Sequence, residues 1–171
     1  RSDPQGERIA IASDDTTIIM WDATTGERLR TLAGHTATIY DVTFSADGRY
    51  LASASADNTV ILWDGQSNQR LRTFSGHTDA IYGVAFSEDA SFMATASADN
   101  TIILWNPETG GRLRTFIGHT DNVHDVQFSR QERVILTGSA DSTAILWDAD
   151  TGERLLTLDQ HDGTVHSVAF S

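Results

Sequence analysis

Short runs of β-branched and aromatic residues, separated by polar turn-forming residues, recur from one end of the chain to the other. Residues 35–77 show the pattern clearly, because it predicts four strands there, at residues 39–45, 50–55, 59–64 and 70–74. No stretch repeats its apolar residues every 3.6 positions, which is the spacing of an amphipathic helix. The sequence therefore predicts an all-β fold with essentially no helix.

The strand pattern itself repeats every 42 residues, without an insertion or a deletion. Three residue types mark the repeat, and each series keeps the same step. The series are Trp21, Trp63, Trp105 and Trp147; His35, His77, His119 and His161; and Asp15, Asp57, Asp99 and Asp141. The chain therefore holds four copies of one unit of four short strands.

The loop that follows each Trp carries a residue suited to a left-handed backbone. Three copies have Thr-Gly, at Gly26, Gly110 and Gly152, and the remaining copy has Asn68. Gly adopts a positive φ without strain, and Asn is the next most tolerant residue. We expect a tight turn at each of these positions.

Each unit also has Gly-His near its start and Trp-Asp near its end, with Gln160-His161 and Trp105-Asn106 as degenerate copies. Units of this length and pattern resemble the WD-repeat family, whose members are β-propellers of four-stranded antiparallel blades. The resemblance covers the whole chain. It implies blades at residues 35–76, 77–118 and 119–160, and a first blade made of residues 8–34 plus a closing strand at 164–171.

Four blades are fewer than most propellers of this family contain, so the sequence leaves the closure of the ring open. An innermost strand is expected at residues 164–171, and the blade at residues 8–34 lacks one. Two copies that exchange this strand would form an eight-bladed ring as a homodimer; the alternatives are a self-closed four-bladed ring and a fragment of another assembly. Small residues in the second strands, such as those at 52–55, let neighbouring sheets approach closely and favour the large ring.

The resemblance further implies a buried hydrogen-bond network in each blade, formed by a His, a Ser or Thr, an Asp and the Trp. A buried indole, imidazole and carboxylate are each costly unless paired, and in series they satisfy one another. Most second strands offer two hydroxyl residues on the same face, and strand alternation does not choose between them. The candidates are His35, Ser53, Ser55, Asp57 and Trp63; His77, Thr95, Ser97, Asp99 and Trp105; His119, Thr137, Ser139, Asp141 and Trp147; and, with a single hydroxyl, His161, Ser13, Asp15 and Trp21.

One position early in each innermost strand carries a ring, in the series Tyr40, Tyr82, His124 and His166. In the family, this part of the strand faces the top surface, where partners usually dock, and Tyr and His suit interface contacts. The four residues are therefore candidates for binding proteins or peptides, with simple packing at the rim as the alternative. Asp41 and Asp125 beside them are expected to make the central channel acidic.

Charge and composition exclude several classes of partner. The net charge is −12 and all 12 basic residues are Arg, so the chain repels phosphate backbones and anionic membrane surfaces. No apolar run approaches the length that spans a bilayer, and no signal peptide opens the chain, so we expect a cytoplasmic protein. Without Cys, neither a disulfide nor a thiolate metal site can form.

Two His pairs, 119 with 124 and 161 with 166, are the only metal candidates in the sequence. Both lie at loop-to-strand junctions, and their spacing is not that of a helical zinc site, so we expect no metal and no cofactor.

The preferred function is a non-catalytic protein-interaction scaffold. A catalytic Ser, His and Asp would need a nucleophile elbow, and no G-x-S-x-G occurs. The rival is a hydrolase or lyase that uses a channel carboxylate with His124 or His166. The strict register also fits an engineered or recently amplified array that self-assembles.

Overall fold

The computed structural model describes residues 1–130 and 133–171, and the chain forms fifteen strands in these ranges. They make four antiparallel sheets, which we call blades 1 to 4. Blade 1 contains β1 (Arg8–Ala12), β2 (Thr17–Asp22) and β3 (Arg28–Ala33); blade 2 contains β4 (Ile39–Phe44), β5 (Tyr50–Ser55), β6 (Thr59–Asp64) and β7 (Arg70–Ser75); blade 3 contains β8 (Ile81–Phe86), β9 (Met93–Ser97), β10 (Thr101–Trp105) and β11 (Arg112–Ile117); and blade 4 contains β12 (Val123–Phe128), β13 (Val134–Ser139), β14 (Ala144–Asp148) and β15 (Arg154–Leu158).

The all-β prediction is confirmed for the described residues. In blade 2, β5 and β6 coincide with the predicted ranges, and β4 and β7 each differ from the predicted range by one residue at one end. Each strand pairs with its neighbour in the sequence. No helix in the described ranges is long and apolar enough to cross a membrane.

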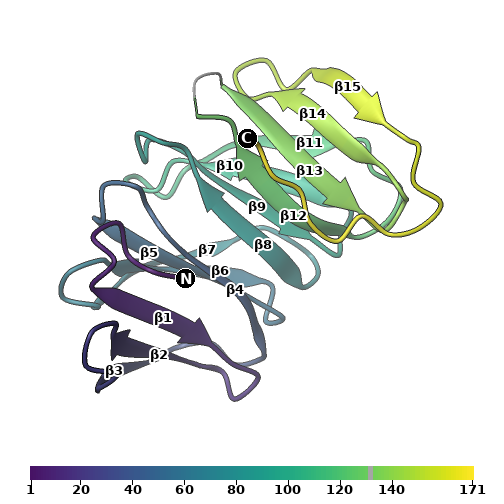
Figure 1. Cartoon of the computed structure of the whole chain (residues 1–171). Coiled ribbons are helices and arrows are strands. Elements are labelled where there is room, and N and C mark those ends of the chain that lie inside the picture. Colours follow the sequence, from purple (N-terminus) through teal and green to yellow (C-terminus); the bar gives the residue numbers. More distant parts are fainter. Residues whose placement is uncertain (131–132) are drawn as a thin grey trace.

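The hydrophobic core lies between neighbouring blades, which stand side by side in an open arc (Figure 1). Between blades 2 and 3, Ala52 and Ala54 of β5 are completely buried in one cluster with Met93 of β9. At the outer end of this interface Phe74 meets Trp105 edge-on, with ring centroids 5.4 Å apart. The small side chains of the second strands thus allow the close approach of sheets that the sequence predicts.

The loops after the Trp residues adopt the predicted left-handed backbone. The φ angles are 71° at Gly26, 79° at Gly110 and 81° at Gly152, and Asn68 takes the same conformation with a φ of 58°. In every blade these turns connect the outermost strand to the strand before it, and they keep the 42-residue register.

Blade 1 has three strands, and residues 164–171 do not supply its fourth within this chain. The segment forms no strand, because its expected partner β1 lies at the opposite end of the arc (Figure 1). A self-closed ring of four blades is therefore not the structure of the single chain. Part of the free edge of β1 is instead covered by the chain's own start, where Ser2 pairs with Ile9.

The C-terminal segment docks on blade 4 in the place that the innermost strand of a following blade would take. Its Val165 N–H donates to the carbonyl of Ser139 over 2.9 Å, as Ile39 N–H does to Ser13 over 3.3 Å between blades 1 and 2. Val165 and Val168 also pack so closely on β13 that a Cβ at Gly138 would lie 2.8 Å and 3.0 Å from their methyl groups. The arc therefore ends with an inner segment already in position but without a sheet to pair with.

Candidate interaction surface and buried network

A series of hydrogen bonds links four side chains of blade 2 and of the loop before it. The indole N–H of Trp63 donates to the hydroxyl of Ser53 over 3.0 Å, and this hydroxyl lies 2.8 Å from Nε2 of His35. Nδ1 of the same imidazole lies 2.8 Å from Oδ2 of Asp57. A carboxylate only accepts, so with a neutral imidazole Nδ1 carries the proton and Nε2 accepts from the Ser53 hydroxyl. All three hydrogen bonds of the series then run in the same direction, from the indole N–H towards the carboxylate.

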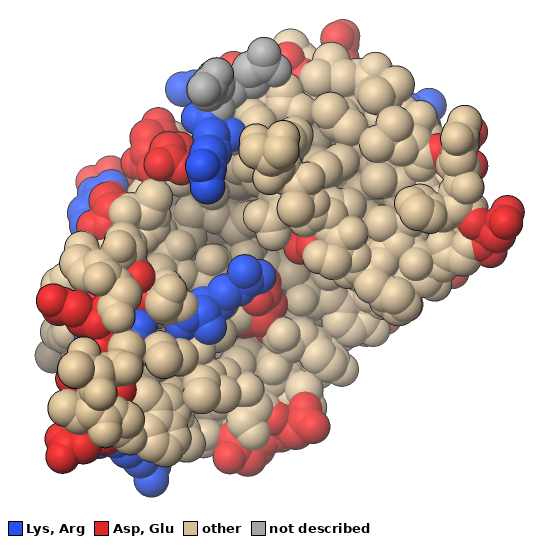
Figure 2. Space-filling model, in the orientation of Figure 1, with Lys and Arg blue, Asp and Glu red and all other residues tan. Residues whose placement is uncertain are grey.

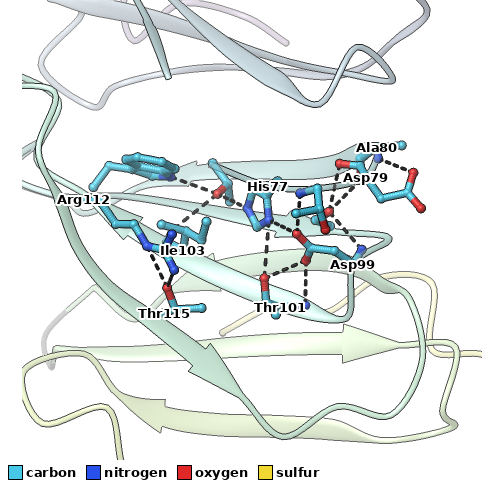
Figure 3. A network of polar contacts seen from close by, with 12 residues as sticks. His77, Asp79, Ala80, Asp99, Thr101, Ile103, Arg112 and Thr115 are labelled. Carbon is cyan, nitrogen blue, oxygen red and sulfur yellow. Dashed lines mark hydrogen bonds and ion pairs between the residues drawn. The ribbon is translucent and has the colours of Figure 1, made fainter. Parts of the chain in front are cut away.

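Blades 3 and 4 repeat this arrangement almost without change. In blade 3, shown in Figure 3, His77 lies 2.7 Å from Thr95 and 2.8 Å from Asp99, and Trp105 donates to Thr95 over 3.0 Å. In blade 4 the corresponding distances are 2.8 Å, 2.8 Å and 2.9 Å, among His119, Thr137, Asp141 and Trp147. The structure thus brings together three of the four expected sets.

The two hydroxyl positions of each second strand have different roles. Ser53, at the first position, joins the network, whereas the hydroxyl of Ser55 accepts the backbone N–H of Asp57 and donates to the carbonyl of Ala37. Ser97 and Ser139 make the equivalent contacts in blades 3 and 4. The second hydroxyl therefore fastens the turn to the preceding loop.

The charges of the network favour a neutral imidazole beside an ionised carboxylate. Burial lowers the pKa of both His77 and His119, and the attraction of their Asp partners does not offset it. Burial opposes the ionisation of Asp141, but hydrogen bonds from Thr143, the backbone of Thr120 and His119 outweigh it and hold the pKa of Asp141 at about 2. The network is thus suited to stabilising the fold.

The fourth expected set is not assembled in the single chain. Asp15 accepts from the backbone N–H and hydroxyl of Thr17, and the indole nitrogen of Trp21 is buried without a partner among the described residues. Ile11 stands where Ser53 stands in blade 2, so no hydroxyl can accept the Trp21 N–H. His161 follows β15 at the other end of the arc, where it is exposed.

The rings of the inner strands form one continuous row. Tyr40 and Tyr82 meet edge-on at a centroid distance of 5.0 Å, Tyr82 and His124 lie 5.1 Å apart, and His124 and His166 lie 5.4 Å apart. Tyr40 is 49% exposed, and Tyr82 and His124 are half-buried. Burial, and the electrostatic effect of the neighbouring His166, lower the pKa of His124. We call this the ring row; it presents aromatic faces and polar tips along the arc.

The acidic residues beside the ring row are tied to the backbone. Asp41 accepts the N–H of Val84 in the next inner strand over 3.1 Å, and Asp125 accepts the N–H of Val168 over 2.9 Å. These oxygens therefore bridge neighbouring inner segments, and the acidic character of the channel stays a prediction. No group of three or more potential metal ligands occurs in the described ranges.

Arginines of the outer strands connect successive blades, a role that the repeat pattern does not reveal. Arg30 donates to the carbonyl of Ser67 in blade 2 over 2.7 Å, and Arg72 donates to the carbonyl of Glu108 in blade 3 over 3.0 Å. Arg114 makes the equivalent bond to Asp150 of blade 4. Each arginine therefore bridges its own blade and the loop of the next.

The family model described as "WD domain, G-beta repeat" matches residues 26–64, 68–106 and 110–148, which together are more than half of the chain. The chain belongs to the WD40-repeat family. The three matches follow one another at the 42-residue step of the Trp and His series.

Individual relatives share parts of this WD40 chain. The nuclear distribution proteins PAC1 of Arthroderma benhamiae and Trichophyton verrucosum are each 53% identical to it over 45 residues, which are 26% of this chain and 10% of theirs. Two solved structures, described as U3-55K and as the WD40 repeats of RRP9, superpose with TM-scores of 0.91 at 28% identity over 96% of this chain. The WD40 chain spans about half the length of those two, 52% and 51%.

Proposed function

We propose that the chain is a non-catalytic protein-interaction scaffold whose docking surface is the ring row, Tyr40, Tyr82, His124 and His166. The continuity of the row carries the proposal, because four rings in mutual contact present one extended face instead of scattered side chains. Aromatic side chains with a polar tip are the residues that protein interfaces favour. The partner would be a protein or peptide, with no nucleic acid, membrane or cofactor involved.

A hydrolase or lyase is the rival reading. The hydroxyls of Ser53, Thr95 and Thr137 are completely buried and already hydrogen-bonded to an imidazole and an indole, which favours a structural role for them. The channel carboxylates are engaged with backbone N–H groups. Both observations support a protein without catalytic activity.

Substitution of exposed ring-row residues tests the docking surface. Proteins retained by the immobilised chain should be lost with Tyr40→Ser/Tyr82→Ser and kept with Leu29→Ser, a control at an outer-strand residue that is 50% exposed. Melting curves of all three proteins check that each is folded. Equal retention by the double variant would refute the docking surface. A turnover that disappears on replacing His124 while the melting temperature is unchanged would favour the enzyme.

We further propose that a second copy completes the propeller as an eight-bladed ring, by exchange of residues 164–171. Two features support this: the docked C-terminal segment, and a hollow of about 280 Å³ beside β1, lined by Arg1, Ala10–Ala12 and Tyr40–Val42. Arg1 and Ser2, which pair with β1 in the single chain, would give way to the exchanged strand. Each blade 1 would then gain its innermost strand from the other chain, and the blade boundaries would be residues 8–34 with 164–171, 35–76, 77–118 and 119–160. Light scattering after size exclusion should give twice the mass of the 18.7 kDa chain, and a strictly monomeric mass would refute the ring.

Two expectations from the sequence remain proposals. An engineered or recently amplified array would account for the strict 42-residue register without any external partner. A cytoplasmic location also stays a prediction.

A further inference from the structure

Three features recur at every joint between blades of this chain. The first is a glycine beneath the Trp of the following blade. A Cβ at Gly34 would lie 3.2 Å from Trp63, one at Gly76 would lie 2.9 Å from Trp105, and one at Gly118 would lie 2.8 Å from Trp147. The position 42 residues after Gly118 is Gln160, which does carry a Cβ.

The second feature is the hydroxyl that links the Trp to the His. Ser53, Thr95 and Thr137 supply it in blades 2 to 4, and Ile11 takes its place in blade 1. Ile11 is 52% exposed, and the buried N–H of Trp21 finds no acceptor in the described ranges.

The third feature is the arginine bridge from each outer strand to the next blade. In blade 4 the residue at the position of Arg30, Arg72 and Arg114 is Leu156, which is 50% exposed and cannot donate a hydrogen bond. Blade 4 and blade 1 therefore both depart from the pattern, and they do so only on the faces that have no neighbour in this chain.

The contacts that remain on these two faces are apolar. Leu158 of blade 4 is 46% exposed, although the equivalent Leu32, Phe74 and Phe116 are buried beneath a Trp. Val165 and Val168 already cover part of blade 4. Figure 2 shows charged side chains mainly around the rim, with few over β12–β14 and the C-terminal segment. On blade 1, the side chains available for this joint are Ile11 and the ring of Trp21.

We infer that the joint between blade 4 of one copy and blade 1 of a second is an apolar joint that lacks the polar network, and that the ring opens reversibly there. The inference rests on the proposed eight-bladed ring. At the register of the internal joints, His161 would face Ile11 instead of a hydroxyl, and the Cβ of Gln160 would press on Trp21. Nε2 of His161 and the indole N–H of Trp21 would then be buried without a hydrogen-bond partner. The three internal joints avoid this penalty.

Restoring the pattern tests the inference. The double variant Ile11→Ser/Gln160→Gly supplies the missing hydroxyl and the missing space. We expect its dimer dissociation constant to be at least about tenfold lower than that of the original chain in sedimentation equilibrium. Leu158→Asp, which places a carboxylate in the joint, should raise the constant by at least about tenfold. The control Ile117→Ser/Gln66→Gly makes the same two exchanges at exposed positions elsewhere and should leave the dissociation constant unchanged.

The outcomes separate this inference from the ring itself. A dimeric original chain with an unchanged constant in Ile11→Ser/Gln160→Gly would overturn the inference and leave the ring intact. A monomeric original chain with a dimeric double variant would support the weak joint and refute the ring at the concentrations used. Monomers in both cases would overturn both. Melting curves confirm that each variant is folded.

Discussion

The indole N–H of Trp105 donates to the hydroxyl of Thr95 over 3.0 Å, and both groups are buried. The same oxygen lies 2.7 Å from Nε2 of His77. One hydroxyl therefore satisfies two aromatic side chains that come from different parts of the repeat. A single oxygen at this position decides whether two buried nitrogens are paired.

Removing that oxygen while keeping the shape of the side chain should destabilise the fold. Thr95→Val leaves the indole and imidazole nitrogens unpaired, and we expect a loss of about 1–3 kcal/mol in the free energy of unfolding. Thr95→Ser keeps the hydroxyl, as Ser53 does in blade 2, and should cost less. Urea denaturation measures both variants. A loss in Thr95→Ser without a loss in Thr95→Val would show that the methyl group, and not the hydrogen bonds, stabilises this site.

The sequence predicts the strands and turns because both follow the 42-residue period, and the resemblance to the WD-repeat family implies the composition of the network. It does not choose between Ser53 and Ser55, because alternate residues of a strand share a face and only the position of the His distinguishes them. The arginine bridges also escape prediction, since they depend on how blades stack. The position of residues 164–171 escapes it too, because the sequence does not show which sheet the segment contacts. The unpaired Trp21 escapes prediction as well, because the sequence leaves Ser13 as the network hydroxyl of blade 1. In the structure, Ser13 accepts the backbone N–H of Asp15, and Ile11 holds the position of the network hydroxyl.

Acid should destabilise the chain in two stages. The pKa of His77 and His119 is lowered from the ordinary 6.5, so the unfolded chain binds protons before the folded chain does, and stability falls as the pH drops below about 6.5. The pKa of Asp141 is about 2 against an ordinary 3.8, so its contribution is complete above 3.8 and is lost between 3.8 and about 2. Melting temperatures between pH 7.5 and 2.5 check both stages.

His77→Gln is the control for the first stage. We expect this variant to be less stable at every pH. Its melting temperature should also fall less steeply between pH 7 and 5, because one titrating imidazole is gone. Identical slopes in the two proteins would contradict the assignment of the first stage to the buried imidazoles.

The contact of Gly118 with Trp147 predicts a steric penalty. A Cβ at Gly118 would lie 2.8 Å from the indole ring, so Gly118→Ala must displace the ring of Trp147 or the backbone in the core between blades 3 and 4. We expect a loss of about 1–3 kcal/mol in unfolding free energy. Gly163→Ala meets no atom within 4 Å and should leave stability unchanged or raise it by up to about 1 kcal/mol. An unchanged stability of Gly118→Ala would contradict this prediction, because it would show that the indole ring or the backbone shifts at no cost.

Phe74 and Leu158 occupy the same position of the repeat, and they should respond very differently to truncation. Phe74 is 3% exposed and packs edge-on against Trp105, so Phe74→Ala leaves a cavity between blades 2 and 3 and should cost about 3–5 kcal/mol. Leu158 is 46% exposed because no blade covers it in the single chain, so Leu158→Ala should cost about 1 kcal/mol or less. Denaturation of dilute chain, at a concentration where light scattering shows monomer, measures both. At high concentration, the difference in cost between Phe74→Ala and Leu158→Ala should shrink if a second copy covers Leu158. Truncation of Leu158 then removes buried contacts as well.

Equal costs for Leu158→Ala and Phe74→Ala in the dilute monomer would contradict the open arc. They would mean that another part of the same chain already covers blade 4.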